Sequence, residues 1–286
     1  MDMDEKVCVV TGANTGIGLE TARELARRGA HVVMTARNME KGEAALADVK
    51  STTGSDRVQL VQLDLASLAS VRKAAETILT WHEDLHVLVN NAGLILSERE
   101  TTEDGFEATI GINHLGHFLL TRLLLDALLR SAPCRVVNLS SEGHRMARKG
   151  LDFDDLMVER RPYGGMNVYC ESKLANILFT KELARRYGDQ GLVSHAVHPG
   201  VVASGFAADG DTAGWFNWMT TLIRPFMITP AKGAATTLHV ATSDEAGASN
   251  GLYWKRSKVS KPTAQARDEQ AAKRLWEISE ELLGLA

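Results

Sequence analysis

Hydrophobic residues recur along this chain in two alternating patterns. Short apolar runs, typical of buried strands, occupy residues 7–10, 30–36, 57–63, 87–89, 135–139, 192–198 and 251–254. Between them apolar residues recur with helical spacing, which predicts helices over 19–26, 38–50, 67–81, 104–131, 166–187, 231–242 and 264–283. Repeated alternation of strand and helix predicts an α/β fold, a doubly wound parallel sheet with helices on both faces. No linker, repeat or low-complexity tract interrupts it, so we expect a single domain over residues 1–286.

A glycine-rich stretch follows the first predicted strand. Residues 11–18 read Thr-Gly-Ala-Asn-Thr-Gly-Ile-Gly and open the first predicted helix. Glycines allow a tight turn and close approach of a ligand, and a helix N-terminus offers free N–H groups to a pyrophosphate. The spacing G-x-x-x-G-x-G differs from the common dinucleotide fingerprint, and a bare connection would also be glycine-rich. The stretch predicts a Rossmann-type nucleotide site with these candidates: Gly12, Asn14, Thr15, Gly16, Ile17 and Gly18.

The carboxyl ends of the predicted strands carry polar residues or glycine. In a parallel sheet these ends share one edge, where ligands bind. After the glycine turn the remaining ends are, in chain order, Ala36-Arg37, Asp64-Leu65, Asn90-Asn91-Ala92-Gly93, Ser140-Ser141 and Pro199-Gly200. Any one of them fits an ordinary turn, whereas six on one edge favour a binding site.

The end of the second predicted strand bears on the choice of cofactor. An acid at this place usually holds the ribose 2′-hydroxyl of NAD, but here the position is Ala36, followed by Arg37. A guanidinium can bind a 2′-phosphate, which an acid would repel. We therefore predict NADP rather than NAD; the alternative is that Arg37 is a solvated loop cation.

Tyr169 and Lys173 lie four residues apart in a predicted helix and therefore share a face. A free tyrosine has a pKa of about 10, and a nearby ammonium group lowers that pKa by favouring the phenolate. The pair can then exchange a proton with a carbonyl or alcohol oxygen. This spacing is frequent by chance, so its weight depends on the other motifs.

The combination of motifs in this chain resembles the short-chain dehydrogenase/reductase family in its short form. The motifs are the glycine turn, Asp64, residues 90–93, Asn113, Ser141, the Tyr169–Lys173 pair and Pro199-Gly200. Residues 113–121 and 169–183 are similar to the retinol dehydrogenase branch. The resemblance implies that Tyr169 is the general acid/base, that Lys173 lowers its pKa and binds the nicotinamide ribose, that Ser141 holds the substrate oxygen, and that Asn113 holds a relay water. It further implies that Asp64 binds the adenine amine, that residues 90–93 line the adenosine ribose, that Val202 meets the carboxamide, and that Leu65 and Ser204 contact the cofactor. Ser140 should point to the opposite side of the strand from Ser141.

Two segments bear on the substrate. Ser141 and Tyr169 are 28 residues apart, and the extra segment, 143–166, resembles an insertion of the retinol dehydrogenase branch that we expect to border the substrate entrance. Residues 203–230 combine aromatic residues, methionines and glycines, a composition that favours a mobile lid covering an apolar substrate. Core packing, a subunit contact or a membrane-touching surface would give a similar composition.

Composition narrows the class of protein. A net charge of −4 and a pI near 6.2 argue against a nucleic-acid-binding surface. The three cysteines are widely spaced, without a zinc pattern, and His114 and His117 have no third convergent ligand, so we expect no metal and core histidines. We expect no signal peptide and no integral membrane segment, since the first strand begins at once, and hence a cytoplasmic protein.

The sequence therefore predicts an NADP-dependent oxidoreductase that interconverts a carbonyl and an alcohol by hydride transfer. The substrate is expected to be small and apolar, and a homo-oligomer is compatible with the sequence. The alternative is an NADP-sensing or scaffold protein on the same fold, without turnover. Loss of the tyrosine, lysine or serine would favour that alternative, and all three residues are present.

Overall fold

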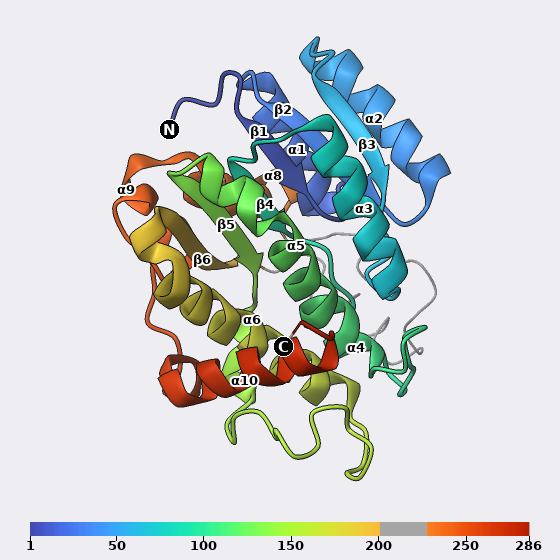
Figure 1. Ribbon diagram of the computed structural model, residues 1–286, viewed down its shortest axis with the longest axis vertical. Helices are drawn as coiled ribbons and strands as arrows, with labels where there is room; N and C mark the ends of the chain where they lie inside the picture. The colour runs from blue at the N-terminus through green and yellow to red at the C-terminus, as the bar shows by residue number, and fades with distance from the viewer. Residues whose placement is uncertain (201–227, 286) are drawn as a thin grey trace.

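The computed structural model describes residues 1–200 and 228–285. Its centre is an eight-stranded sheet in the order β3-β2-β1-β4-β5-β6-β7-β8 (Figure 1). The strands are β1 (Val7–Val10), β2 (His31–Ala36), β3 (Val58–Gln62), β4 (Val87–Asn90), β5 (Cys134–Leu139), β6 (Leu192–His198), β7 (Leu252–Lys255) and β8 (Lys258–Val259). All neighbouring pairs are parallel except β7 and β8. The predicted doubly wound sheet is confirmed, and its strand order reverses between β1 and β4, where such folds bind ligands.

Helices connect the strands and cover both faces of the sheet (Figure 1). The α-helices are α1 (Gly16–Arg27), α2 (Met39–Thr53), α3 (Leu68–Trp81), α4 (Ala108–Ile110), α5 (Gly116–Arg130), α6 (Gly165–Tyr187), α8 (Pro230–Thr242), α9 (Asp244–Gly247) and α10 (Glu269–Leu282). Shorter turns are the π-helix η1 (Gly111–Leu115) and the 3-10 helices η2 (Glu142–Met146), η3 (Gly188–Gln190) and η5 (Gln265–Arg267). None of the helices in the described ranges combines the length and apolar character needed to cross a membrane.

The alternation of side chains along the strands divides the core in two. On β1, Val9 belongs to one apolar cluster, whereas Cys8 and Val10 belong to the other. The first cluster lies between the sheet and α3, α5, α6 and α10, and the second between the sheet and α1, α2 and α8. Because both faces are covered, the central strands β1 and β4 are apolar apart from Asn90. The buried polar residues inside β5 and β6, such as Asn138 and His195, are hydrogen-bonded.

The predicted helix over 104–131 is interrupted. Residues 108–110 form α4, residues 111–115 form the π-helix η1, and only Gly116 begins the regular helix α5. A π turn holds one extra residue, which the apolar spacing does not reveal, and such turns are frequent at functional sites. The predicted helix over 264–283 is also divided, because Asp268 accepts hydrogen bonds from Gln270 N and Ala271 N and so starts α10 anew.

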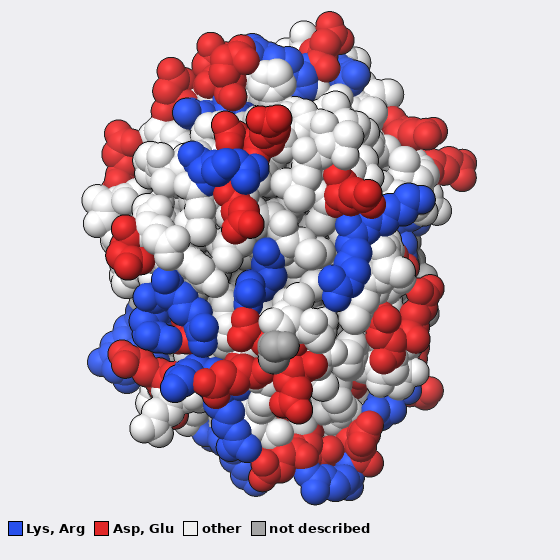
Figure 2. Space-filling model, viewed as in Figure 1, with Lys and Arg blue, Asp and Glu red and all other residues white. Residues whose placement is uncertain are grey.

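The outer side of α5 and α6 is covered by α10. Trp276 of α10 is buried against Phe118 and Phe179, with ring centroids at 4.8 and 5.9 Å. The guanidinium groups of Arg122 and Arg186 lie 5.3 and 4.6 Å from the Trp276 ring. Figure 2 shows acidic and basic side chains interspersed over this face, without a large field of one sign.

Candidate active site

The glycine turn, residues 11–18, has the backbone that its sequence requires. Gly12 and Gly16 have φ angles of 61° and 60°, in the left-handed region that favours glycine. A Cβ atom on Gly18 would lie 2.3 Å from the carbonyl oxygen of Gly12 and 2.5 Å from Asn91 Nδ2. Any side chain at position 18 would therefore collide with the backbone of the turn itself.

The N-terminus of α1 lies at the end of this turn. The N-cap residue, Thr15, makes no side-chain capping hydrogen bond, and the first turn of α1 contains no acidic residue. Asn14, Thr15 and Ile17 are partly or fully exposed around it. N–H groups without a side-chain cap, a positive dipole end and three glycines fit the pyrophosphate of a dinucleotide.

A buried threonine links this turn to the neighbouring strand ends. Thr11 Oγ1 accepts hydrogen bonds from Asn91 N at 2.9 Å and Ala92 N at 3.0 Å, and it lies 2.9 Å from His117 Nε2. The other ring nitrogen of His117 lies 3.2 Å from the carbonyl oxygen of Asn113. That oxygen can only accept, so Nδ1 carries the proton and Nε2 accepts from Thr11; burial lowers the pKa of His117 to about 3 and keeps it neutral.

His117 is thus a core histidine, as predicted, but it also ties the glycine turn to the π-helix that carries Asn113. Sequence reasoning missed this connection. The available signal was the four-residue spacing between Asn113 and His117 on one helix face.

The adenosine side of the site carries the predicted polar residues. Ala36 is buried at the end of β2, and Arg37 is exposed and has no ion pair within residues 1–200 and 228–285. Asp64 Oδ1 accepts a hydrogen bond from Ala66 N at 2.9 Å. Arg37 and Asp64 therefore stand beyond two adjacent strands, β2 and β3, at the edge that carries the glycine turn.

Two predicted cofactor residues have their side chains in the core instead. Asn90 Nδ2 donates to Thr121 Oγ1 at 3.0 Å and to Asn138 Oδ1 at 2.8 Å, which makes Asn90 part of a buried polar network between β4, β5 and α5. Leu65 is buried against Gly116, where a Cβ atom would lie 2.7 Å from the carbonyl oxygen of Leu65. The side chains of these two residues face the helix behind the sheet, so the predicted contact with the cofactor would come from their backbone, and it stays a prediction.

Asn113 is fixed by the π-helix η1. Its Oδ1 accepts from Leu94 N at 2.8 Å, and its Nδ2 donates to Leu94 O at 2.9 Å and to Ser172 Oγ at 3.0 Å. Both amide hydrogens are therefore used within the protein. A Cβ atom on Gly93 would lie 3.0 Å from Asn113 Oδ1 and 3.2 Å from Lys173 Nζ, so Gly93 allows these two side chains to approach.

Ser141, Tyr169 and Lys173, hereafter the Ser–Tyr–Lys cluster, are brought together by β5, η2 and α6. Ser141 is a hydrogen-bond partner of Tyr169, and Lys173 Nζ lies 5.4 Å from the centroid of the Tyr169 ring. Burial raises the pKa of Tyr169 to about 12, and its hydrogen bond with Ser141 opposes that rise. Burial lowers the pKa of Lys173 to about 8. The expected effect of Lys173 on Tyr169 stays a prediction.

The two serines after β5 point in different directions, as predicted. Ser140 Oγ donates to the carbonyl oxygen of Lys173 at 2.7 Å and is buried. Ser141 Oγ accepts from Gly143 N at 3.0 Å. This bond uses only an acceptor site of Ser141, so its single hydroxyl hydrogen can be donated to Tyr169 or to a substrate oxygen.

The segment 143–166 folds back onto α6. The carboxylate of Asp155 accepts from Glu159 N at 2.8 Å and from Arg160 N and Arg161 N, both at 3.1 Å. Arg161 Nη1 then donates to Glu171 Oε1 at 2.7 Å, two residues after Tyr169. The segment therefore packs on α6, the helix that carries Tyr169 and Lys173, and its place at the substrate entrance stays a prediction.

Pro199 and Gly200 follow β6 at the same edge of the sheet. Gly200 has a φ angle of 100°, and a Cβ atom there would lie 2.6 Å from Ile228 Cδ1. Val202, Ser204 and the predicted lid, apart from residues 228–230, lie outside the described residues.

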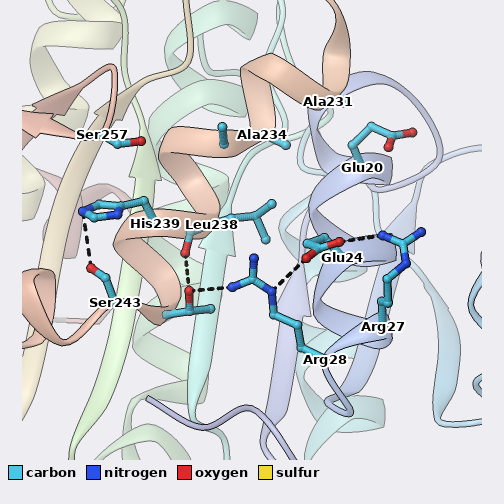
Figure 3. Close-up of a pocket in the computed structure, with 12 residues that line it drawn as sticks. Glu20, Glu24, Arg27, Arg28, Ala231, Ala234, Leu238, His239, Ser243 and Ser257 are labelled. Carbon is cyan, nitrogen blue, oxygen red and sulfur yellow. Dashed lines mark hydrogen bonds and ion pairs between the residues drawn. The ribbon is translucent and has the colours of Figure 1, made fainter.

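A hollow of about 500 Å³ lies between α1 and α8 (Figure 3). It is lined by Glu24, Arg28, Leu238 and other residues of the two helices, and by none of the site candidates. Arg28 donates to Glu24 Oε1 at 2.9 Å and to Thr242 Oγ1 at 3.0 Å, so its charge is already paired. We assign no ligand to this hollow.

Comparisons with solved structures agree with this geometry. An uncharacterized protein from Mycobacterium Paratuberculosis superposes with a TM-score of 0.79 at 36% identity, over 99% of this chain and 95% of that one. A short chain dehydrogenase from Burkholderia cenocepacia in complex with NADP superposes with a TM-score of 0.70 at 26% identity, over 89% of this chain and 97% of that one.

Sequence comparisons give the family. Human retinol dehydrogenase 11 is 46% identical over 280 residues, which cover 98% of this chain and 86% of that protein. Human retinol dehydrogenase 13 is 44% identical over 283 residues, which cover 98% of this chain and 85% of that protein. The family model described as short chain dehydrogenase matches residues 6–152, and the chain therefore belongs to the short-chain dehydrogenase/reductase family.

Proposed function

We propose that this protein is an NADP-dependent oxidoreductase that interconverts a carbonyl and an alcohol on a small apolar substrate. The observation that carries the proposal is the assembly of the Ser–Tyr–Lys cluster at the strand ends beside the glycine turn. Sensor or scaffold proteins on this fold have no need of an acid/base tyrosine hydrogen-bonded to a serine.

The residues of the cluster have distinct tasks. A bound nicotinamide would supply the hydride for reduction of the carbonyl carbon and accept it in the reverse direction. Ser141 accepts from Gly143 N and donates its hydroxyl hydrogen to the substrate oxygen. Tyr169 transfers its hydroxyl proton to that oxygen on reduction and takes it back on alcohol oxidation. Lys173 favours the resulting phenolate through its positive charge.

The preference for NADP rests on the end of β2. Ala36 leaves no acid there, and the exposed Arg37 is available to a 2′-phosphate. The apolar substrate class is supported by the names of the similar retinol dehydrogenases, of which three are 44–46% identical to this chain.

A cofactor and substrate panel tests the proposal. Purified protein is incubated with NADPH or NADH and with apolar ketones, aldehydes and retinaldehyde, and cofactor absorbance is followed. We expect carbonyl-dependent oxidation of NADPH that is faster than that of NADH at equal concentration. Tight NADPH binding without turnover on any carbonyl or alcohol would favour the sensor or scaffold alternative.

The cellular location and the oligomeric state are separate proposals. We propose a cytoplasmic protein, which the free and buried state of all three cysteines supports. Fractionation of cells that express the untagged chain tests this. Light scattering of the purified protein tests for a homo-oligomer.

A further inference from the structure

Glu142, the residue after Ser141, connects the turn η2 to strand β7 by hydrogen bonds. Glu142 lies in η2, and its carboxylate accepts from Tyr253 Oη at 2.9 Å and Lys255 Nζ at 2.8 Å. Both partners belong to β7, and Tyr253 lies 111 residues further along the chain. Arg145 Nε, within η2, donates to the same carboxylate at 3.2 Å.

The backbone on both sides of Ser141 is held as well. The carbonyl oxygen of Ser141 lies 2.6 Å from His144 Nδ1, and the His144 ring packs edge-on against Tyr253 at 5.0 Å. Glu142 N donates to His198 Nδ1 at 3.3 Å, at the end of β6. Burial lowers the pKa of His198 to about 4, so that nitrogen stays available as an acceptor at neutral pH.

This hydrogen bonding constrains the one atom of Ser141 that the reaction uses. Ser141 Oγ accepts a hydrogen bond from Gly143 N, so the orientation of the Ser141 side chain depends on the conformation of η2. A Cβ atom on Gly143 would lie 3.4 Å from Ser141 Oγ and 3.5 Å from Tyr169 Cε1, which shows how closely η2 packs against the cluster. A shift of η2 would therefore move Ser141 Oγ relative to Tyr169.

We propose that Glu142 is a positioning residue for Ser141, acting with Tyr253 and Lys255 of β7. The inference rests on the proposed function, since it concerns the serine of that reaction. The competing account is a surface ion pair that only adds stability. The side chains of Glu142 and Lys255 are 29% and 32% exposed, and pairs so exposed contribute little to stability.

Glu24 provides a matched control. Its side chain is also 29% exposed, and it pairs with two cations, Arg27 and Arg28, as Glu142 does with Lys255 and Arg145. Glu24 lies on α1 and lines the hollow of Figure 3, away from the cluster. If ion-pair loss alone mattered, Glu24→Ala and Glu142→Ala would behave alike.

The test is a double-mutant cycle with NADPH and the best carbonyl of the panel. Glu142→Ala should lower kcat by about tenfold or more, as expected for a slightly misplaced catalytic group, with KM and NADPH affinity little changed. Glu142→Gln keeps an acceptor for Tyr253, so its kcat should lie between those of the wild type and Glu142→Ala. Glu24→Ala should keep wild-type kcat. In a Ser141→Ala background, Glu142→Ala should cause no further loss in single-turnover rate, because it acts through Ser141.

Four results separate the possible failures. An active wild type with unchanged kcat in Glu142→Ala and Glu142→Gln overturns the inference alone. An equal loss with and without Ser141 also overturns it, because Glu142 would then act independently of the serine. A wild type that binds NADPH but turns over no substrate overturns the proposed function and this inference together. The melting temperature of every variant is measured as well. If Glu24→Ala and Glu142→Ala lose kcat in the same proportion to their loss of melting temperature, the ion-pair account is supported and the inference is overturned.

Discussion

The glycine turn and the Ser–Tyr–Lys cluster lie on one sheet edge, yet they hold their polar groups in opposite ways. The turn leaves the first N–H groups of α1 without a side-chain cap, and Arg37 beside it is exposed. In the cluster Lys173 is buried, Ser141 and Tyr169 are partly buried, and neighbouring groups hold Ser141, Ser140 and Asn113 by hydrogen bonds. Uncapped groups suit a ligand that must bind and leave, whereas groups held by their neighbours suit a reaction that depends on fixed distances. Substitutions at the two regions should therefore affect different quantities.

The largest effect is expected at the centre of the cluster. Tyr169→Phe removes the hydroxyl that exchanges the proton, and general acid–base catalysis of this kind contributes about 10²- to 10⁴-fold. We expect kcat to fall by at least about a hundredfold. The affinity for NADPH, measured by fluorescence titration, should stay near that of the wild type.

Tyr187→Phe is the control for this change, because Tyr187 packs near Trp276 at 6.2 Å, outside the cluster. It should keep wild-type kcat. A Tyr169→Phe protein with more than a small fraction of wild-type turnover contradicts the assignment of Tyr169.

Lys173 should show that the cluster is maintained at a cost in stability. Burial lowers its pKa from 10.5 to about 8, so folding disfavours the charged form at neutral pH. Lys173→Met should abolish turnover yet raise the free energy of unfolding at pH 7, by about 3 kcal/mol at most.

The pH dependence of that gain has a definite sign. Since the folded pKa lies below the unfolded one, the unfolded chain binds more protons between pH 8 and 10.5, and the penalty fades as pH rises through this range. The stability difference between Lys173→Met and wild type should thus be largest below pH 8 and shrink above it. The exposed Lys73, changed to Met, should give no such difference. A Lys173→Met protein less stable than the wild type at every pH contradicts this account.

Arg37 tests the cofactor side of the site, next to the glycine turn. A charge-assisted hydrogen bond to a 2′-phosphate contributes about 1.5–3 kcal/mol. Arg37→Ala should therefore raise KM for NADPH by about tenfold or more and leave KM for NADH nearly unchanged. Placing an acid at Ala36 as well should improve the use of NADH. Equal responses of both cofactors would show that Arg37 does not contact the phosphate.

The smallest effect is expected at Gly18. An added Cβ would meet the Gly12 carbonyl at 2.3 Å, and overpacking of this kind typically costs about 1–3 kcal/mol. Gly18→Ala should weaken NADPH binding, measured by titration, more than it lowers kcat at saturating cofactor. Gly188→Ala is the control, since its added Cβ would meet only Asn250 Nδ2, at 3.0 Å, rather than backbone at 2.3 Å. Equal cofactor affinity in both variants contradicts the proposed role of the turn.

The fold could be predicted because its evidence is local. Each strand and helix contains its own period of apolar residues, and the cap of α2 by Asn38 and the αL residue Gly54 at its end are also local signals. The π turn could not be predicted, because one extra residue at 111–115 leaves the apolar spacing of the surrounding helix intact.

The candidate site divides along the same line. The residues of the Ser–Tyr–Lys cluster follow from motifs, but the inward orientation of Asn90 depends on Thr121 and Asn138, which come from other elements. Glu142 gave no sequence signal, because Tyr253 and Lys255 are brought beside it only by the pairing of β6 with β7.

The cover that α10 places over α5 and α6 has a consequence for how the chain is made. Trp276 meets Phe118 and Phe179, which leave the ribosome roughly 150 and 100 residues earlier at about 5–20 residues per second. Between the emergence of β6 and that of α10, an interval of several seconds or longer, the nascent polypeptide carries strands β1–β6 with one apolar helix face uncovered. Chaperone contact during synthesis is therefore expected to end with the emergence of residues 269–282 rather than with completion of the sheet.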